Sequence, residues 1–194
     1  MAAEKGKSAG RAFDLVSESS APTPILKTQR YTMRPLVRSD TEALFPTLSD
    51  PENCKFMLRA AFESEEELAN WLCDPDWNGR TWVAIEDISG DLVARLVAVP
   101  VAEKVSEIGY ITIAGRRGEG IASECTARLM RYLFEEEEHH RLTADTDPRN
   151  EASNAVLRKL GFTMEGHLRQ SVETHIGWCD EYIWGMLTSD WKVS

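Results

Sequence analysis

Two glycines mark an abrupt change of pattern near the middle of the chain. Before them, residues 107–113 read as a strand, and after them Ala122, Cys125 and Leu129 recur at helical spacing. The turn itself reads Arg-Arg-Gly-Glu-Gly over residues 116–120. Glycines let main-chain amides approach a ligand closely, and the N-terminus of the following helix carries partial positive charge. The segment therefore predicts a strand–turn–helix unit that can hold a phosphate group.

Strand-like and helix-like runs follow one another along the rest of the chain and predict a mixed α/β fold. We expect strands at 31–36, 81–86, 92–99, 107–113, 141–146, 162–168 and 182–187, and helices at 40–48, 64–72, 122–133 and 152–160. Ser64 and Glu67 have the spacing of a capping box, which places the start of the second helix. A polar loop is expected between the last two strands.

The length and composition suit one domain with a single core. The chain has 194 residues, of which 42% are hydrophobic, so we expect one globular domain over residues 28–194. Residues 1–27 are small, polar and charged, and we expect them to form a disordered tail. The tail lacks the apolar segment of a secretory signal, and no run approaches the roughly 18 apolar residues of a membrane span. We therefore expect a cytoplasmic protein without membrane association.

Charge and cysteine spacing narrow the classes of partner and cofactor. The net charge of −10 opposes binding to nucleic acid and favours a cationic or amine partner. The four cysteines are widely separated and include no CxxC pair, so we expect inert thiols and no metal. The acidic run 135–138, followed by His139 and His140, is interpreted as a solvated helix end.

A second motif lies downstream of the glycine turn. Residues 150–162 read Asn-Glu-Ala-Ser-Asn-Ala-Val-Leu-Arg-Lys-Leu-Gly-Phe, a helical run that ends at a glycine. Asn150 also suits the N-cap of that helix. The two motifs together resemble the GNAT acetyltransferase superfamily, whose acetyl-CoA turn reads Arg/Gln-x-x-Gly-x-Gly/Ala. Arg117, Gly120 and Ala122 match that turn in register.

The resemblance implies a fold and a cofactor site. The implied fold is a central, mostly antiparallel twisted sheet with helices on both faces, and acetyl-CoA enters where the central strands splay apart. Main-chain groups of the strand end are expected to contact the pantetheine arm. The implied acetyl-CoA contacts are Ile111, Thr112, Ile113, Arg116, Arg117, Gly118, Glu119, Gly120, Ile121, Ala122, Asn150, Ser153 and Asn154.

The catalytic assignments depend on a departure from the superfamily pattern. Many members have a tyrosine seven residues after the asparagine, where it protonates the CoA thiolate, but this chain has Leu157. The RimJ/RimL-like branch also lacks the tyrosine and has a serine at the position of Ser153, and its Trp-rich hairpin resembles residues 177–191. We take Ser153 as the proton donor, Asn150 as its catalytic neighbour, and Glu107 as the base or, alternatively, a solvated strand-end glutamate.

The expected reaction is acetyl transfer to an amine, and the acceptor stays open. A protein N-terminus and a small amine both fit, as do a monomer and a homodimer. Because Leu157 replaces the usual acid, a non-catalytic acyl-CoA sensor or partner-binding module is a rival interpretation. A third possibility, an unrelated nucleotide-binding enzyme, explains the glycine turn but not residues 150–162.

Overall fold

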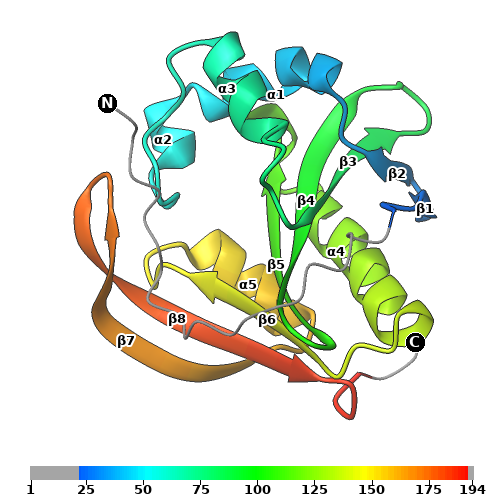
Figure 1. The fold of residues 1–194 in the computed structure, drawn as a ribbon, viewed down its shortest axis with the longest axis vertical. Coiled ribbons are helices and arrows are strands. Elements are labelled where there is room, and N and C mark those ends of the chain that lie inside the picture. Colours follow the sequence, from blue (N-terminus) through cyan, green and yellow to red (C-terminus); the bar gives the residue numbers. More distant parts are fainter. Residues whose placement is uncertain (1–21, 192–194) are drawn as a thin grey trace.

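A sheet of eight strands forms the centre of the protein in the computed structural model, which describes residues 22–191 (Figure 1). The strand order is β1-β2-β3-β4-β5-β6-β8-β7, and only the β5–β6 pair is parallel among these strands. The strands are β1 (Leu26–Lys27), β2 (Tyr31–Pro35), β3 (Arg80–Glu86), β4 (Leu92–Ala102), β5 (Val105–Thr112), β6 (Arg141–Thr146), β7 (Thr163–Thr174) and β8 (Gly177–Leu187). The predicted mixed α/β class, with a mostly antiparallel sheet, is confirmed.

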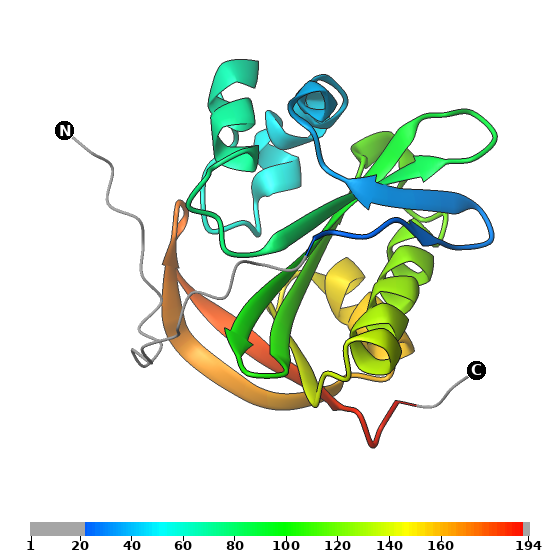
Figure 2. The ribbon, with the colours of Figure 1, turned by 45° about the vertical axis from the view of Figure 1, so that its right-hand side comes forward.

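Helices cover both faces of this sheet. Figure 2 shows α1 to α3 on one side, and α4 and α5 on the other. The helices are α1 (Thr41–Leu48), α2 (Pro51–Cys54), α3 (Glu65–Leu72), α4 (Ile121–Arg131) and α5 (Glu151–Lys159), with short turns η1 (Arg38–Asp40), η2 (Ala114–Arg116) and the π-helical η3 (Tyr132–Glu136). No helix within residues 22–191 has the length and apolar content to cross a membrane.

Each face has its own hydrophobic core. The larger core packs α4 and α5 against the sheet and includes Trp82 and Trp184, both almost fully buried. The smaller core packs α1 to α3 against the opposite face around Leu44, Leu68 and Val83. Because side chains alternate between the two faces of a strand, each central strand contributes to both cores. The sheet is thereby fixed between two helical layers.

The sheet opens between β5 and β6. The two strands pair only over Val105–Arg141, Ser106–Leu142 and Glu107–Thr143. Beyond Glu107, β5 continues to Thr112 beside β4 alone. The edge of β5 that faces β6 is therefore without a strand partner over its second half, which leaves room between the strands.

Several local expectations are confirmed, and others are wrong. Ser64 is the N-cap of α3 and accepts a hydrogen bond from the Glu67 amide at 3.2 Å. The expected polar loop over 169–181 is wrong, because β7 and β8 continue through it to a tight turn at 174–177. Both faces of this part of the hairpin are largely exposed, so the sequence lacks an apolar alternation there.

Two boundaries also differ from the expectations. Leu26 is buried and pairs with Met33 of β2, so the sheet begins inside the segment 1–27 that was expected as tail. Residues 1–21 of that segment lie outside the described residues. The acidic run after α4 is not simply solvated, because Glu137 forms a two-bond ion pair with Arg80 at 2.6 Å.

Candidate active site

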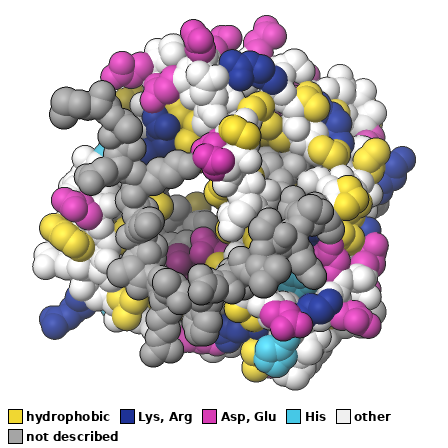
Figure 3. Space-filling model, in the orientation of Figure 1, with side chains coloured by type: hydrophobic (Ala, Val, Ile, Leu, Met, Phe, Trp, Pro, Cys, Tyr) yellow, Lys and Arg dark blue, Asp and Glu magenta, His cyan; other side chains and the backbone are white. Residues whose placement is uncertain are grey.

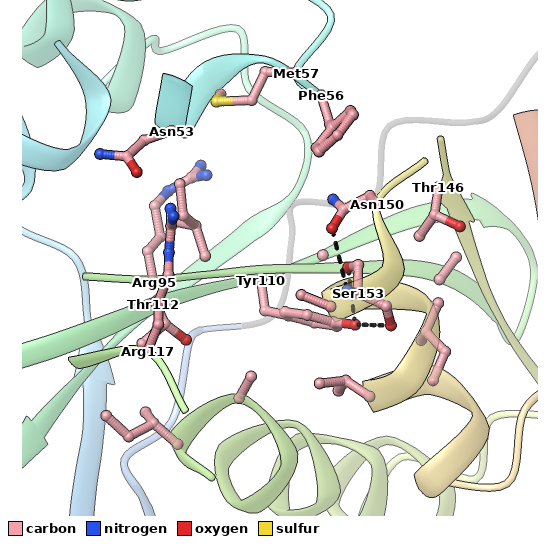
Figure 4. Close-up of a pocket in the computed structure, with 18 of the residues that line it drawn as sticks. Asn53, Phe56, Met57, Arg95, Tyr110, Thr112, Arg117, Thr146, Asn150 and Ser153 are labelled. Atoms are coloured by element: carbon pink, nitrogen blue, oxygen red, sulfur yellow. Dashed lines mark hydrogen bonds between the residues drawn. The ribbon is translucent and has the colours of Figure 1, made fainter. Parts of the chain in front are cut away.

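A cavity of about 690 Å³ passes through the gap between β5 and β6 (Figure 4). Its lining comes from both faces of the sheet. Tyr110 and Ala144 belong to the face that carries α4 and α5, whereas Arg95, Ile111 and Asp145 belong to the opposite face. A ligand on one face can therefore meet a ligand on the other without crossing a hydrogen-bonded sheet.

The glycine turn forms the wall beside α4. Gly118 and Gly120 have φ of 83° and 79°, a left-handed conformation that favours glycine. Gly120 is the N-cap of α4, and no side chain caps the helix. The turn and the first residues of α4 line the cavity through Gly118, Gly120, Ile121, Ala122 and Ser123. The first-turn amides of α4 thus face a cavity without a capping side chain, which suits an anion.

The two arginines of the turn differ in their partners. Arg116 lines the cavity, but Glu86 and Glu119 each contact its guanidinium at 2.8 Å and neutralise its charge. Glu119 itself is not part of the lining. Arg117 is exposed, lines the cavity and enters no ion pair among residues 22–191. Arg117 is therefore the better placed of the two to contact a phosphate.

The open edge of β5 offers main-chain groups to the cavity. Ile113 donates its amide to Val93 of β4 at 3.0 Å. Main-chain amides and carbonyls point to alternate sides along a strand. Because those of Ile113 point to β4, the amides and carbonyls of Tyr110 and Thr112 point towards the gap. Ile111 lines the cavity, whereas Ile113 packs into the smaller core and does not. Of the predicted pantetheine contacts Ile111, Thr112 and Ile113, Thr112 is the one whose main-chain groups face the gap.

The start of α5 brings two hydroxyl groups together. The Asn150 side chain accepts a hydrogen bond from the Ser153 amide at 3.2 Å, so Asn150 is the N-cap. Ser153 Oγ donates to the Tyr110 hydroxyl at 3.1 Å, and that hydroxyl donates to the Ser153 carbonyl (Figure 4). Burial raises the pKa of Tyr110 to about 12. Ser153, Asn150 and Tyr110 line the cavity, with Tyr110 protonated at neutral pH.

Two residues near α5 have packing roles. Asn154 is fully buried and contacts the Thr146 hydroxyl at 2.6 Å and the Pro148 carbonyl at 3.1 Å. Its side chain fixes the β6–α5 connection, and it does not line the cavity. Leu157 is also fully buried and lines the cavity beside Ser153.

Three carboxylates lie on the face opposite α4 and α5. Asp145 of β6 lines the cavity, and Glu107 of β5 and Glu181 of β8 lie near it. The Asp145 side chain is open to the cavity, but the protein around it limits its hydration. This desolvation, then repulsion from Glu107 and from Glu181, raises the pKa of Asp145 to about 7. Burial also raises the pKa of Glu107, which does not itself line the cavity. Figure 3 looks onto a hollow of the molecule in which acidic side chains are visible.

The far wall comes from α2 and the segment after it. Asn53, Phe56 and Met57 face the cavity across from Ser153 (Figure 4). The tip of the β7–β8 hairpin contacts this segment, because the His175 amide donates to the Leu58 carbonyl and the His175 ring Nδ1 donates to the Met57 carbonyl, each at 3.2 Å. No group of three His, Cys, Asp or Glu side chains in the described part of the chain is arranged to hold a metal ion.

Comparison with known proteins identifies this architecture. The family model described as the acetyltransferase (GNAT) domain matches residues 30–163. The chain belongs to the GNAT acetyltransferase family. The expected RimJ/RimL-like resemblance and the expected N-acetyltransferase class are confirmed.

Individual relatives agree with this membership. The chain is 26% identical to the uncharacterized N-acetyltransferase YnaD of Bacillus subtilis (strain 168). The match covers 86% of this chain and 99% of YnaD. A GNAT-family acetyltransferase from Bacillus anthracis superposes with a TM-score of 0.80 at 26% identity, covering 86% of this chain and 99% of that one. Mycobacterium smegmatis RimJ, solved with CoA-disulfide, gives a TM-score of 0.78 at 21% identity, over 89% and 91% of the two chains.

Proposed function

We propose that this acetyltransferase moves an acetyl group from acetyl-CoA to a primary amine by direct attack in the gap between β5 and β6. One observation carries the proposal: the same cavity is lined by the glycine turn of α4 on one face of the sheet and by Asp145 on the other. A donor bound along α4 and α5 and an acceptor entering from the opposite face meet at the gap. Positioning two reactants in this way supplies much of the rate enhancement of a two-substrate reaction.

Acetyl-CoA fits the helical side of the cavity. The uncapped amides of α4 and the unpaired Arg117 would hold its pyrophosphate, and the free edges of Tyr110 and Thr112 would pair with its pantetheine amides. When bound, acetyl-CoA supplies an activated acetyl thioester. The chain's own contribution is to orient this thioester towards the acceptor face.

Asp145 is the group that would take the proton of the amine. It lines the cavity on the acceptor face, and its pKa of about 7 matches the requirement for a base at neutral pH. Glu107, the base expected from the sequence, lies beside Asp145 and outside the lining. We therefore assign Glu107 to keeping the pKa of Asp145 high, and Asp145 to proton removal.

Ser153 and Tyr110 would return a proton to the departing thiolate. The serine hydroxyl faces the cavity and is backed by the tyrosine hydroxyl at 3.1 Å. The tyrosine, whose raised pKa keeps it protonated, donates to the Ser153 carbonyl in the resting site. After Ser153 Oγ gives up its proton, the tyrosine O–H would turn to the serine oxygen and replace that proton, and solvent would then reprotonate the tyrosine. Asn150, as the cap of α5, holds the backbone of Ser153 in place.

A paired binding and turnover measurement tests the proposal. Acetyl-CoA is titrated calorimetrically, and release of the CoA thiol is followed with N-terminal peptides and with small amines. We expect binding together with acceptor-dependent release, and the better class of acceptor decides between protein and small-molecule substrates. Binding without release for any acceptor would favour a non-catalytic acyl-CoA sensor, and absence of binding would refute the donor assignment.

A further inference from the structure

The half-buried side chain of Arg95 lines the cavity and has no counter-ion in the described part of the chain. Its Nε is buried and has no hydrogen-bond partner among residues 22–191, and no ion pair in that range includes the residue. Burial lowers the pKa of Arg95 to about 10, with no carboxylate opposing that effect, so the side chain is still charged at neutral pH. A guanidinium whose Nε is buried without a hydrogen-bond partner is costly to a fold, which suggests that a ligand supplies the missing partner.

The position of Arg95 is fixed by its neighbours. It stands on β4 opposite Ile111 of β5 and lines the acceptor face of the cavity (Figure 4). Its guanidinium carbon lies 4.8 Å from the ring centre of Trp71 in α3, a cation–π contact that supports the charged group from one side. The ring supports the guanidinium from one side, and the side-chain nitrogens make no hydrogen bond to other residues between 22 and 191.

An acid on the same face is also left without a partner. Asp145 lines the same cavity, and its carboxylate takes part in no hydrogen bond or ion pair within residues 22–191. The two charges are opposite, yet they do not pair, because β5 lies between β4 and β6. One cavity thus has a cationic wall and an acidic wall separated by the strand at which the acetyl group would arrive.

We propose that Arg95 binds a carboxylate of the acceptor, so that the acceptor carries both a primary amine and a carboxylate. The amine is directed to Asp145 and the carboxylate to Arg95, whose planar fork suits a two-bond contact. A free amino acid and a peptide with an acidic residue near its N-terminus both have this chemistry. The inference rests on the proposed function, because it names the acceptor class of the same site.

Matched acceptors test the proposal. CoA release is measured with free amino acids against their C-terminal amides, and with Ala-Glu peptides against Ala-Gln peptides. We expect the carboxylate member of at least one series to be preferred by about tenfold or more in kcat/KM. In the Arg95→Met variant this ratio falls to about one through a higher KM for the carboxylate member, while the Kd of acetyl-CoA is unchanged. The series that shows the preference distinguishes amino acids from peptides.

Two further variants separate recognition from a structural role. Arg95→Lys keeps the charge without the fork, so we expect it to retain part of the preference. Arg117→Met should weaken acetyl-CoA binding and leave the preference intact. Because Met removes an unpaired, half-buried charge, Arg95→Met should also raise the Tm of the protein without ligands; a lower Tm would indicate a structural role.

The inference can fail separately from the proposed function. Turnover with no carboxylate preference, or a preference that persists in Arg95→Met, would overturn the inference alone. A weaker acetyl-CoA Kd in Arg95→Met with an unchanged acceptor KM would assign the residue to a phosphate of the donor and also overturn it. If no acceptor is turned over, N-acetylated amino acids and their amides are titrated in the presence of CoA. Tighter binding of the acids, lost in Arg95→Met, would still support the inference, and equal or absent binding would reject it.

Discussion

At the scale of single residues, Asp145 sets the expected pH dependence of the reaction. With a pKa raised to about 7, it becomes a competent base only as the pH rises through that value. We expect kcat/KM to rise with pH to an inflection near 7, and Asp145→Asn to lower kcat by about 10²- to 10⁴-fold with loss of that inflection. Glu107→Gln removes a charge that raises the pKa of Asp145, so the inflection in the profile of this variant should move to lower pH.

The control for this pH profile is an exposed acid that does not line the cavity. Glu151 is almost fully exposed, and Glu151→Gln should leave the inflection in place. An inflection that persists unchanged in Asp145→Asn would exclude Asp145 as the base. The same raised pKa affects stability, because the folded state binds a proton more tightly than the unfolded chain. The protonation of Asp145 should therefore make the free energy of unfolding fall as pH rises from about 4 to 7. The fall should be smaller in Asp145→Asn.

The hydroxyl pair beside α5 gives a second prediction at this scale. Ser153→Ala should lower kcat with little change in the Kd of acetyl-CoA, because it removes a proton donor and leaves the phosphate contacts in place. Tyr110→Phe should also lower kcat, but by less, since Ser153 still faces the cavity. The kcat values come from CoA release and the Kd from calorimetry. Wild-type turnover in the serine variant would remove Ser153 from the mechanism.

At the scale of elements, the turn before α4 permits a matched test of its binding role. Gly120 and Gly90 both have φ of 79°, but Gly90 lies in the β3–β4 turn, away from the cavity. Alanine at either position meets the same backbone strain, so both variants should lose about 1–2 kcal/mol of stability. Only Gly120→Ala should weaken acetyl-CoA binding, by about tenfold or more. Equal affinities in the two variants would mean that the turn does not hold the donor.

The end of α4 is held to the sheet by a half-buried ion pair. Arg80 of β3 and Glu137 have side chains only 11% and 19% exposed, and the Tyr132 hydroxyl contacts both. Glu137→Ala leaves Arg80 without its partner, and we expect a loss of about 3–5 kcal/mol in urea unfolding. The exposed pair Arg158–Glu151 is the comparison, and Glu151→Ala should cost less than about 1 kcal/mol. Similar losses for both would contradict this assignment.

The elements themselves were predictable where the pattern was regular. Periodicity located α3 to α5, because each has one buried face with a clear repeat. The central strands were located as short apolar runs bounded by turn residues. It failed for the distal half of the β7–β8 hairpin, where both faces are exposed, and for α2, which has only four residues. The two-residue strand β1 was also missed, since Leu26 is buried by tertiary contacts that no local repeat reveals.

At the scale of the whole molecule, the site combines parts that local motifs reveal with parts that only topology brings together. The glycine turn and the start of α5 were predicted, because a turn and a helix cap are local in sequence. Asp145, Tyr110 and Arg95 were missed, since each stands in an ordinary strand and becomes part of the cavity only through the opening of the sheet. For Arg95 and Asp145 the available signal was a charge within a strand that is otherwise apolar.

Direct transfer requires donor and acceptor to occupy the two faces of the sheet at the same time. The most direct measurement is the initial rate of CoA release with acetyl-CoA and acceptor concentrations varied against each other. Direct attack requires both substrates to be bound at once, so we expect double-reciprocal lines that intersect. Parallel lines would show that the acetyl group first passes to the enzyme and the donor leaves before the acceptor binds, which would contradict direct attack.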